Sequence, residues 1–411
     1  MAGLKGVIFS LRGVLVQRQF NTPLFERTVQ LISFLHSRGI KTVFASNSHW
    51  VLQPSEKPFE ELINERLGEQ TFYYGGQNMD YKPRAKAIQD ILAAEGWQHN
   101  EVVYVGNTTD DMKTANNGRV LFLNALWHGE ENPYGFQFAS PEDVGRFLDC
   151  LCLRLTDWFW AIEDNDLRAY ALGPYSTLSA RYKAAFDYSQ GAKDTAKFGI
   201  DDDEFWGRLL AARVYLSGLV DEIDYVTCYP GHSITSGPPQ VESALSILAG
   251  TVRKKFLPDL IQRHTTATKS QTARTANVAV DVANQLNTIK LNRKPRKGIG
   301  KEPYKNPVSL RGKTILVVDD FCTSGNSFEG ARAYFQAAGA KMIGLAWLKT
   351  INSNYNAIYG GTPVADPYSA TGSFSGVPTT SYPYANSIKS HMAMYDLAKT
   401  YEDYQNWAWG I

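Results

Sequence analysis

The sequence has few of the features that mark secreted, membrane-bound or nucleic-acid-binding proteins. Its 411 residues include only four cysteines, too few and too scattered for a disulfide scaffold or a zinc ribbon. The 42 Lys and Arg residues against 41 Asp and Glu residues leave a formal net charge of +1. No overall field therefore attracts nucleic acid or an anionic membrane, and we expect a protein of the reducing cytoplasm.

Long apolar runs are also absent. The first twenty residues lack a basic start followed by an apolar stretch, which argues against a signal peptide. The most apolar later stretch, residues 147–162, is interrupted by Asp149, Arg154 and Asp157. We therefore expect no membrane span.

The sequence does have the composition of a globular α/β protein. With 44% hydrophobic and 12% aromatic residues the chain can bury a core, and its length predicts two domains. In the first domain, expected over residues 1–139, short β-rich runs alternate with stretches of helical spacing, which indicates βαβ units and a parallel sheet. The predicted strands are 6–9, 42–45, 102–105 and 120–123, and the predicted helices are 24–37, 59–67, 84–95 and 110–117.

The second half repeats this α/β pattern. Ser140 and Pro141 are typical of a helix start, and a connecting segment over 140–165, helical to about Trp160, should lead into a second domain over 166–411. The sequence thus predicts two Rossmann-like parallel-sheet domains. The expected helices here are 203–219, 241–256 and 327–338, and the expected strands are 223–228, 314–318 and 342–348.

Two segments of the second half differ in composition from their surroundings. Residues 292–305 carry six basic residues and one acid. Residues 352–390, which we call the hood segment, are rich in Gly, Ser, Thr, Pro and Tyr with only Asp366 and Lys389 charged. The first could bind phosphates non-specifically, although the balanced net charge makes a nucleic-acid role the weakest hypothesis. The second predicts either a cover over a binding site or a surface loop.

The strongest chemical signal is the motif from Ile315 to Ser327. An apolar strand ends in Asp319 and Asp320, and a turn rich in hydroxyl groups and backbone amides then opens a helix. Such a turn stabilises a phosphate through hydrogen bonds and the helix dipole. The carboxylates beside it can accept hydrogen bonds from vicinal hydroxyls, so the motif predicts a sugar phosphate as ligand.

This motif resembles the phosphoribosyl-diphosphate (PRPP) signature of type I phosphoribosyltransferases. Ser324 and Ser327 stand where threonine is usual. The resemblance implies that Asp319 and Asp320 hold the ribose hydroxyls, and through them Mg²⁺. It also implies that a turn cradles the 5′-phosphate, formed by Thr323, Ser324, Gly325, Asn326 and Ser327.

Two further segments fit the same family. Residues 224–233 read as a strand ending in Pro-Gly-His-Ser, and the resemblance implies that His232 and Ser233 contact pyrophosphate. Residues 254–274 resemble the basic stretch of ComF-type phosphoribosyltransferases, which implies that Arg263 and Lys269 also contact pyrophosphate. Taken alone, the first segment is equally compatible with an ordinary strand-to-loop turn, and the second with a solvated basic helix.

The first domain carries four short motifs that resemble haloacid dehalogenase-like hydrolases. They follow the family's order, at residues 6–15, 44–47, 81–83 and 104–111. Ser10 stands where the family has its nucleophilic aspartate, and Arg12 replaces the general acid. The resemblance implies a degenerate site that could bind phosphate without cleaving it, formed by Ser10, Arg12, Ser46, Lys82, Asn107 and Asp111.

These observations leave two hypotheses. The preferred one is a Mg²⁺-dependent phosphoribosyltransferase that exchanges pyrophosphate for an unidentified acceptor, for which a nucleobase is one candidate. The alternative is a non-catalytic PRPP or nucleotide sensor with a pseudo-phosphatase domain. Partners are expected to be small molecules, with a homodimer left open.

Overall fold

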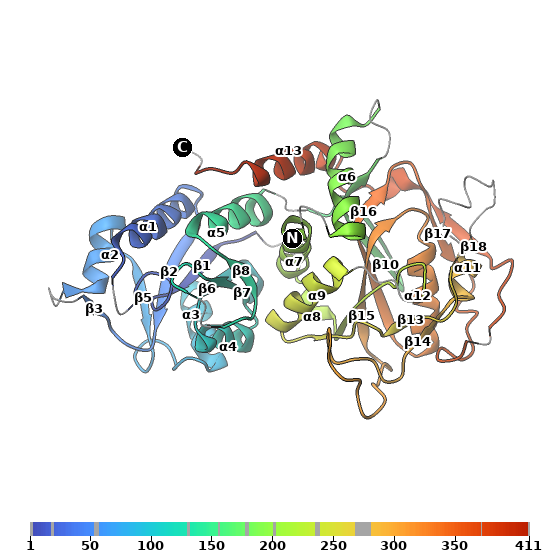
Figure 1. The fold of residues 1–411 in the computed structure, drawn as a ribbon, viewed down its shortest axis with the longest axis horizontal. Coiled ribbons are helices and arrows are strands. Elements are labelled where there is room, and N and C mark those ends of the chain that lie inside the picture. Colours follow the sequence, from blue (N-terminus) through green and yellow to red (C-terminus); the bar gives the residue numbers. More distant parts are fainter. Residues whose placement is uncertain are drawn as a thin grey trace.

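The computed structural model describes residues 3–17, 20–52, 57–129, 132–154, 157–176, 181–199, 203–234, 239–267, 281–370 and 372–409. It has two α/β domains side by side, each built on a six-stranded sheet (Figure 1). The predicted fold class is confirmed. Within the described part of the chain, no helix is both long and apolar enough to cross a membrane.

The first sheet is entirely parallel, with the strand order β5-β2-β1-β6-β7-β8. Its central strands are buried along their length because helices cover both faces. The strands are β1 (Gly6–Ser10), β2 (Lys41–Ser46), β5 (Thr71–Tyr74), β6 (Val102–Gly106), β7 (Leu121–Ala125) and β8 (Phe136–Phe138). A small hairpin, β3 (Val51–Leu52) with β4 (Lys57–Pro58), lies apart from the sheet.

Helices α1 (Thr22–Ser37) and α5 (Pro141–Phe147) pack together on one face of this sheet, and α3 (Ala85–Glu95) and α4 (Thr109–Gly118) on the other (Figure 1). Helix α2 (Phe59–Leu67) packs beside α1. All four predicted strands and four predicted helices of this domain are confirmed, with ends that shift by one or two residues.

The second sheet has the order β12-β11-β15-β16-β10-β9 and is parallel except for β9 at its edge. Its strands are β9 (Trp160–Asp164), β10 (Leu167–Tyr175), β11 (Tyr225–Cys228), β12 (Lys255–Phe256), β15 (Thr314–Cys322) and β16 (Lys341–Thr350). Two small antiparallel sheets of two strands each accompany it, β13 (Ile261–Arg263) with β14 (Ile289–Leu291) and β17 (Tyr355–Ile358) with β18 (Thr379–Tyr382). Its helices are α6 (Lys183–Phe198), α7 (Asp203–Leu216), α8 (Leu219–Glu222), α9 (Pro239–Thr251), α11 (Val282–Leu286), α12 (Asn326–Ala337) and α13 (Ala393–Gln405).

Three predicted helices end earlier than expected, and the one expected over 203–219 ends at Leu216. The connecting helix α5 continues only as a π-helical turn to Leu153, and Trp160 begins strand β9. The reason is tertiary packing, because the fully buried Trp160 side chain lies against Tyr355 while its backbone pairs with β10. Helix α9 likewise ends at Thr251, and the chain from Lys255 forms β12.

The chain returns to the first domain at its C-terminal end. Helix α13 runs at the top of the view from beside α6 toward the first domain, and the chain after it reaches α1 and α5 (Figure 1). The rings of Trp407 and Trp409 both lie within 6 Å of the Phe34 ring on α1, with centroid distances of 5.8 and 5.7 Å. Trp407 also donates a hydrogen bond to Asp149, at 3.0 Å. One continuous hydrophobic cluster therefore spans both domains.

Candidate functional sites

The acidic motif lies at the carboxyl end of β15, in the middle of the second sheet. Asp319 and Asp320 are half-buried, and the chain then turns through residues 323–327 into α12. Gly325 has a positive φ of 82°, and a Cβ there would collide with the ring of Tyr355. The turn therefore requires glycine at this position.

A small cavity of about 90 Å³ lies in this turn. Its lining includes Asp319 and all five residues predicted to cradle a phosphate, together with Gln285 from α11. Asp320 follows directly along the strand, and its backbone amide donates to Asp319 Oδ1 at 3.0 Å. The structure thus gathers the predicted sugar-phosphate residues at one strand end.

The charge state of Asp319 depends on its surroundings and on its neighbour in the chain. Burial raises the pKa of Asp319 well above its usual range, and the neighbouring charge of Asp320 raises it further. Hydroxyl groups of a bound sugar would donate to these oxygens and stabilise their charged form. The pair therefore gains most from a ligand that supplies hydrogen-bond donors or a cation.

The turn is braced from the side of the hood segment. The amide of Asn356 donates to the carbonyl of Ser324 at 2.9 Å, and the hydroxyls of Thr323 and Thr350 lie 2.9 Å apart. Within α12, the fully buried Glu329 accepts hydrogen bonds from Tyr355 and from the amide of Ile358. These contacts tie β17 to the turn and its helix.

The predicted pyrophosphate residues have different surroundings. Arg263 is buried at 6% exposure, and its guanidinium donates to the carbonyls of Gly231 and Pro230 and to Gln285 and Thr288. It therefore holds the loop after β11 in place. His232 is exposed and Ser233 half-buried in this loop, while Lys269 lies outside the described residues.

A larger cavity of about 440 Å³ lies on the other side of Arg263. Its lining includes His264, Lys290 and Arg296 together with Glu242 and Asp259. Burial raises the pKa of Glu242, and burial together with the charges of Lys290 and Arg263 lowers that of His264. The basic segment 292–305 contributes Arg296 to this cavity, where it pairs with Asp259 at 3.5 Å.

The hood segment contacts α11 and α12 and the outer side of the turn, but it does not line the small cavity. Asn287 exchanges two hydrogen bonds with the backbone of Phe374, and the amide of Leu291 donates to the carbonyl of Pro367. Among the described residues, none from 352–390 lines the 90 Å³ cavity. That this segment covers an acceptor stays a prediction.

In the first domain, the structure joins Ser10, Lys82 and Asp111 at the carboxyl ends of β1 and β6. Lys82 Nζ lies 2.7 Å from Asp111 Oδ1 and 3.2 Å from Ser10 Oγ. The hydroxyl of Tyr104 also donates to Asp111 Oδ1, and the amides of Asn107 and Thr108 donate to Oδ2. Both carboxylate oxygens are thus occupied by protein donors.

The charges at this site follow from its burial. Burial alone raises the pKa of Asp111, but the charge and hydrogen bond of Lys82 outweigh it, and the pKa falls below its usual value. Burial and the adjacent Asp111 raise the pKa of Tyr104 well above its usual range. Tyr104, absent from the predicted site, is a tyrosine within an otherwise aliphatic strand, and that is the signal that could have identified it.

The other predicted residues of this site face elsewhere. Ser46 exchanges hydrogen bonds with Ser48, and Arg12 is exposed. The Asn107 amide nitrogen donates to the carbonyls of Ala125 and Gly129, while its oxygen is buried with no partner in the described structure. A hydroxyl, a saturated carboxylate and an arginine do not suit a divalent cation. Among the described residues, no cluster of three or more His, Cys, Asp or Glu side chains could hold a metal.

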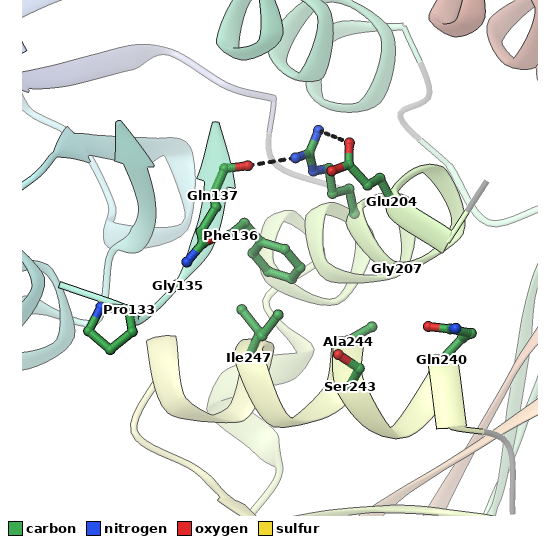
Figure 2. Close-up of a pocket in the computed structure, with 11 residues that line it drawn as sticks. Pro133, Gly135, Phe136, Gln137, Glu204, Gly207, Gln240, Ser243, Ala244 and Ile247 are labelled. Atoms are coloured by element: carbon green, nitrogen blue, oxygen red, sulfur yellow. Dashed lines mark hydrogen bonds and ion pairs between the residues drawn. The ribbon is translucent and has the colours of Figure 1, made fainter. Parts of the chain in front are cut away.

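A third cavity, of about 330 Å³, lies between the domains (Figure 2). Phe136 from β8 and Ile247 from α9 stand on opposite sides of it. The guanidinium of Arg208 is almost fully buried and donates to the carbonyl of Gln137 at 2.7 Å and to Tyr404 at 2.9 Å. Arg208 therefore links β8, α7 and α13.

Comparison with known proteins gives structural neighbours only. No family model and no curated protein matches the chain. One similar solved structure is the cobalt-bound deoxy-D-mannose-octulosonate 8-phosphate phosphatase of Haemophilus influenzae, with 18% identity over 30% of this chain and 69% of that chain, at a TM-score of 0.24. Another is a HAD-superfamily hydrolase of Geobacter sulfurreducens, with 12% identity over 34% of this chain and 98% of that chain, at a TM-score of 0.26. A likeness of this size does not assign the chain to a family.

Proposed function

We propose that this protein binds a phosphoribosyl compound at the end of β15 and exchanges pyrophosphate at its anomeric carbon, as a phosphoribosyltransferase-like enzyme. The observation that carries the proposal is the cavity that unites Asp319 with the whole turn 323–327. Its two halves match the two halves of the ligand, since carboxylates suit vicinal hydroxyls and a helix-opening turn suits a phosphate.

The chemistry asked of the protein is mostly positioning and charge stabilisation. Asp319 and Asp320 would hold the ribose hydroxyls, and the amides and hydroxyls of the turn would hold the 5′-phosphate. Mg²⁺ would enter with the ligand's pyrophosphate and take ligand oxygens, which fits a carboxylate pair that reaches it through the ribose. When bound, the ion would neutralise the departing pyrophosphate.

The loop after β11 would complete this site. Arg263 fixes the carbonyls of Pro230 and Gly231, so the backbone that follows presents His232 and Ser233 beside β15. We assign Arg263 a positioning role, because its guanidinium already serves four protein acceptors. Contact with pyrophosphate is left to His232, Ser233 and Lys269.

We further propose that the first domain is a haloacid dehalogenase-like domain without phosphatase activity. It lacks an activated nucleophile, because the lysine beside Ser10 is engaged in an ion pair with Asp111 instead of serving as a base. Its remaining carboxylate, Asp111, is consumed by Lys82, Tyr104 and two backbone amides. This closed site also supports the second candidate function, a PRPP or nucleotide sensor whose first domain serves as a rigid partner.

Calorimetry with purified protein tests the binding step. The titrants are PRPP, ribose 5-phosphate and common nucleotides, each with and without Mg²⁺. We expect PRPP to bind more tightly with Mg²⁺ than without it, and ribose 5-phosphate to bind without needing the ion. Absence of binding by every phosphoribosyl compound would refute both the enzyme and the sensor.

Turnover separates the two candidates. Pyrophosphate release from PRPP is measured across a panel of nucleobases. Release with one acceptor establishes the transferase, whereas tight PRPP binding without release for any acceptor favours the sensor.

A further inference from the structure

Lys349 is the most completely buried lysine near the candidate site. It occupies the carboxyl end of β16, beside β15, and its side chain has 0% exposure. A buried apolar site of this kind would favour leucine or methionine, because burying an ammonium group costs several kcal/mol even after relaxation. A lysine in this position therefore needs partners that offset that cost.

Its partners come from the turn and from the hood segment. The ammonium donates to the carbonyl of Thr323, at 2.5 Å, and to the carbonyl of Ser353. It also lies over the rings of Trp160 and Tyr384, at 5.3 and 5.6 Å from their centroids. Thr323 is the first residue of the turn, whereas Ser353 and Tyr384 belong to the hood segment.

The charge of Lys349 has no carboxylate partner among the described residues within ion-pair distance. Burial accordingly lowers its pKa. Carbonyl dipoles and ring faces stabilise the cation only in part. An anion held in the turn would bring negative charge near the ammonium, because Thr323 both lines the cavity and accepts the hydrogen bond of Lys349.

We propose that Lys349 is a positioning residue that couples the turn 323–327 to the hood segment, so that each segment is ordered only when the other is. A phosphate group bound in the turn would stabilise this ordered state. This rests on the proposed function for the identity of the ligand, but the coupling itself belongs to the protein alone. A second connection supports it, because Asn356 in the hood segment donates to the carbonyl of Ser324 in the turn.

The test compares the wild type with Lys349→Met, which removes both donors and charge, and Lys349→Gln, which keeps a donor without the charge. Lys341→Met is the matched control, because Lys341 is exposed at the opposite end of the same strand. Circular dichroism and Tm establish that each variant is folded, and Lys349→Gln stands in if the methionine variant does not fold.

Amide hydrogen exchange of the unliganded protein measures the coupling between the turn and the hood segment directly. In Lys349→Met we expect faster exchange at both 323–327 and 353–358, with an intermediate effect in Lys349→Gln and none in Lys341→Met. Faster exchange at only one of the two segments, or at neither, would overturn the proposal. This readout needs no ligand, so it stands even if the proposed function fails.

Binding measurements then test whether Lys349 affects the affinity for a phosphorylated ligand. With ribose 5-phosphate as probe, Lys349→Met should weaken affinity about tenfold or more. Wild-type protein should also show slower exchange in 353–358 when the probe is bound. Exchange that changes while affinity for the phosphate compound stays the same would reduce Lys349 to a structural residue and refute its role toward the ligand. A wild type that binds no phosphorylated probe would refute the proposed function and the ligand step, leaving the exchange result to decide the coupling.

Discussion

Lys82 and Asp111 form an ion pair inside the first domain, with Nζ 2.7 Å from Oδ1 and side chains that are only 9% and 0% exposed. The pair lies at the carboxyl ends of β1 and β6, beside the hydroxyl of Ser10. Because the Asp111 carboxylate also accepts hydrogen bonds from Tyr104 and from two backbone amides, its oxygens have hydrogen-bond partners without any ligand. The arrangement has the properties of a structural element.

Removing one partner of this pair should destabilise the protein strongly. In Asp111→Asn the Lys82 ammonium would be left buried without its counter-charge, at an expected cost of about 3–5 kcal/mol in the free energy of unfolding. Denaturant unfolding measures this cost, and Asp110→Asn, at an exposed neighbouring position, is the control. A loss no larger than in the control would contradict a buried, satisfied pair.

The same pair should make stability sensitive to acid. The pKa of Asp111 is lower in the folded protein than its ordinary value of about 3.9. Its contribution is therefore fully present above that ordinary value and is lost as the pH falls below it. Comparing unfolding free energies from pH 6 downward should show a steeper loss for wild type than for Asp111→Asn. Parallel curves would show that another group titrates.

The first domain should not hydrolyse phosphomonoesters. Ser10 is buried, and Lys82 beside it is ion-paired with Asp111 and does not serve as a general base, so Ser10 is a poor nucleophile at neutral pH. Assays of the purified protein with p-nitrophenyl phosphate and Mg²⁺ should give no signal, and Ser10→Ala should behave like wild type. Mg²⁺-dependent hydrolysis that disappears in this variant would restore a working phosphatase.

Asp319 and Asp320 should be required for ligand binding but not for folding. The double variant Asp319→Asn, Asp320→Asn should abolish detectable PRPP binding, since neutral amides cannot match two charged acceptors. Its Tm should equal or exceed that of wild type, because the raised pKa of Asp319 indicates that ionisation is unfavourable in the folded state. Calorimetry and thermal unfolding measure the two effects, and unchanged PRPP affinity would refute the site.

Arg263 should affect stability and activity together. In Arg263→Ala the carbonyls of Pro230 and Gly231 and the Gln285 side chain would lose their donor, which should cost about 2–4 kcal/mol. Pyrophosphate release should fall as the loop loses its position, whereas Lys294→Ala, at an exposed site, should change neither quantity. If Arg263→Ala lost turnover at unchanged Tm, Arg263 would contact the departing pyrophosphate directly.

Local sequence patterns predicted the sheets because their strands are apolar runs separated by helices of regular spacing. They also predicted the turn 323–327, because its hydroxyl and amide groups come from residues that are consecutive in the sequence. Patterns failed where distant packing decides the outcome. The aromatic residues after Leu153 could extend a helix, yet pairing of Trp160 with β10 draws them into a strand.

The surroundings of charged side chains were equally hidden. Nothing in the order of residues indicates that Arg263 turns inward to loop carbonyls or that Lys82 meets Asp111, because those contacts join segments that lie far apart in the chain. Lys349 did carry a signal, as a single cation at the end of the apolar run 342–348. A lysine at the end of a central strand must either reach solvent beyond the end of the sheet or donate hydrogen bonds to buried polar groups.

The tryptophans beyond α13 have a consequence for the order in which the protein matures. Phe34 leaves the ribosome early, but the rings that cover it belong to Trp407 and Trp409, which are made near the end of the described chain. The first domain can form its sheet during synthesis, yet part of its apolar surface stays uncovered until the second domain has been synthesised. During that interval this surface needs a chaperone or risks aggregation, so the molecule completes its two halves together rather than in succession.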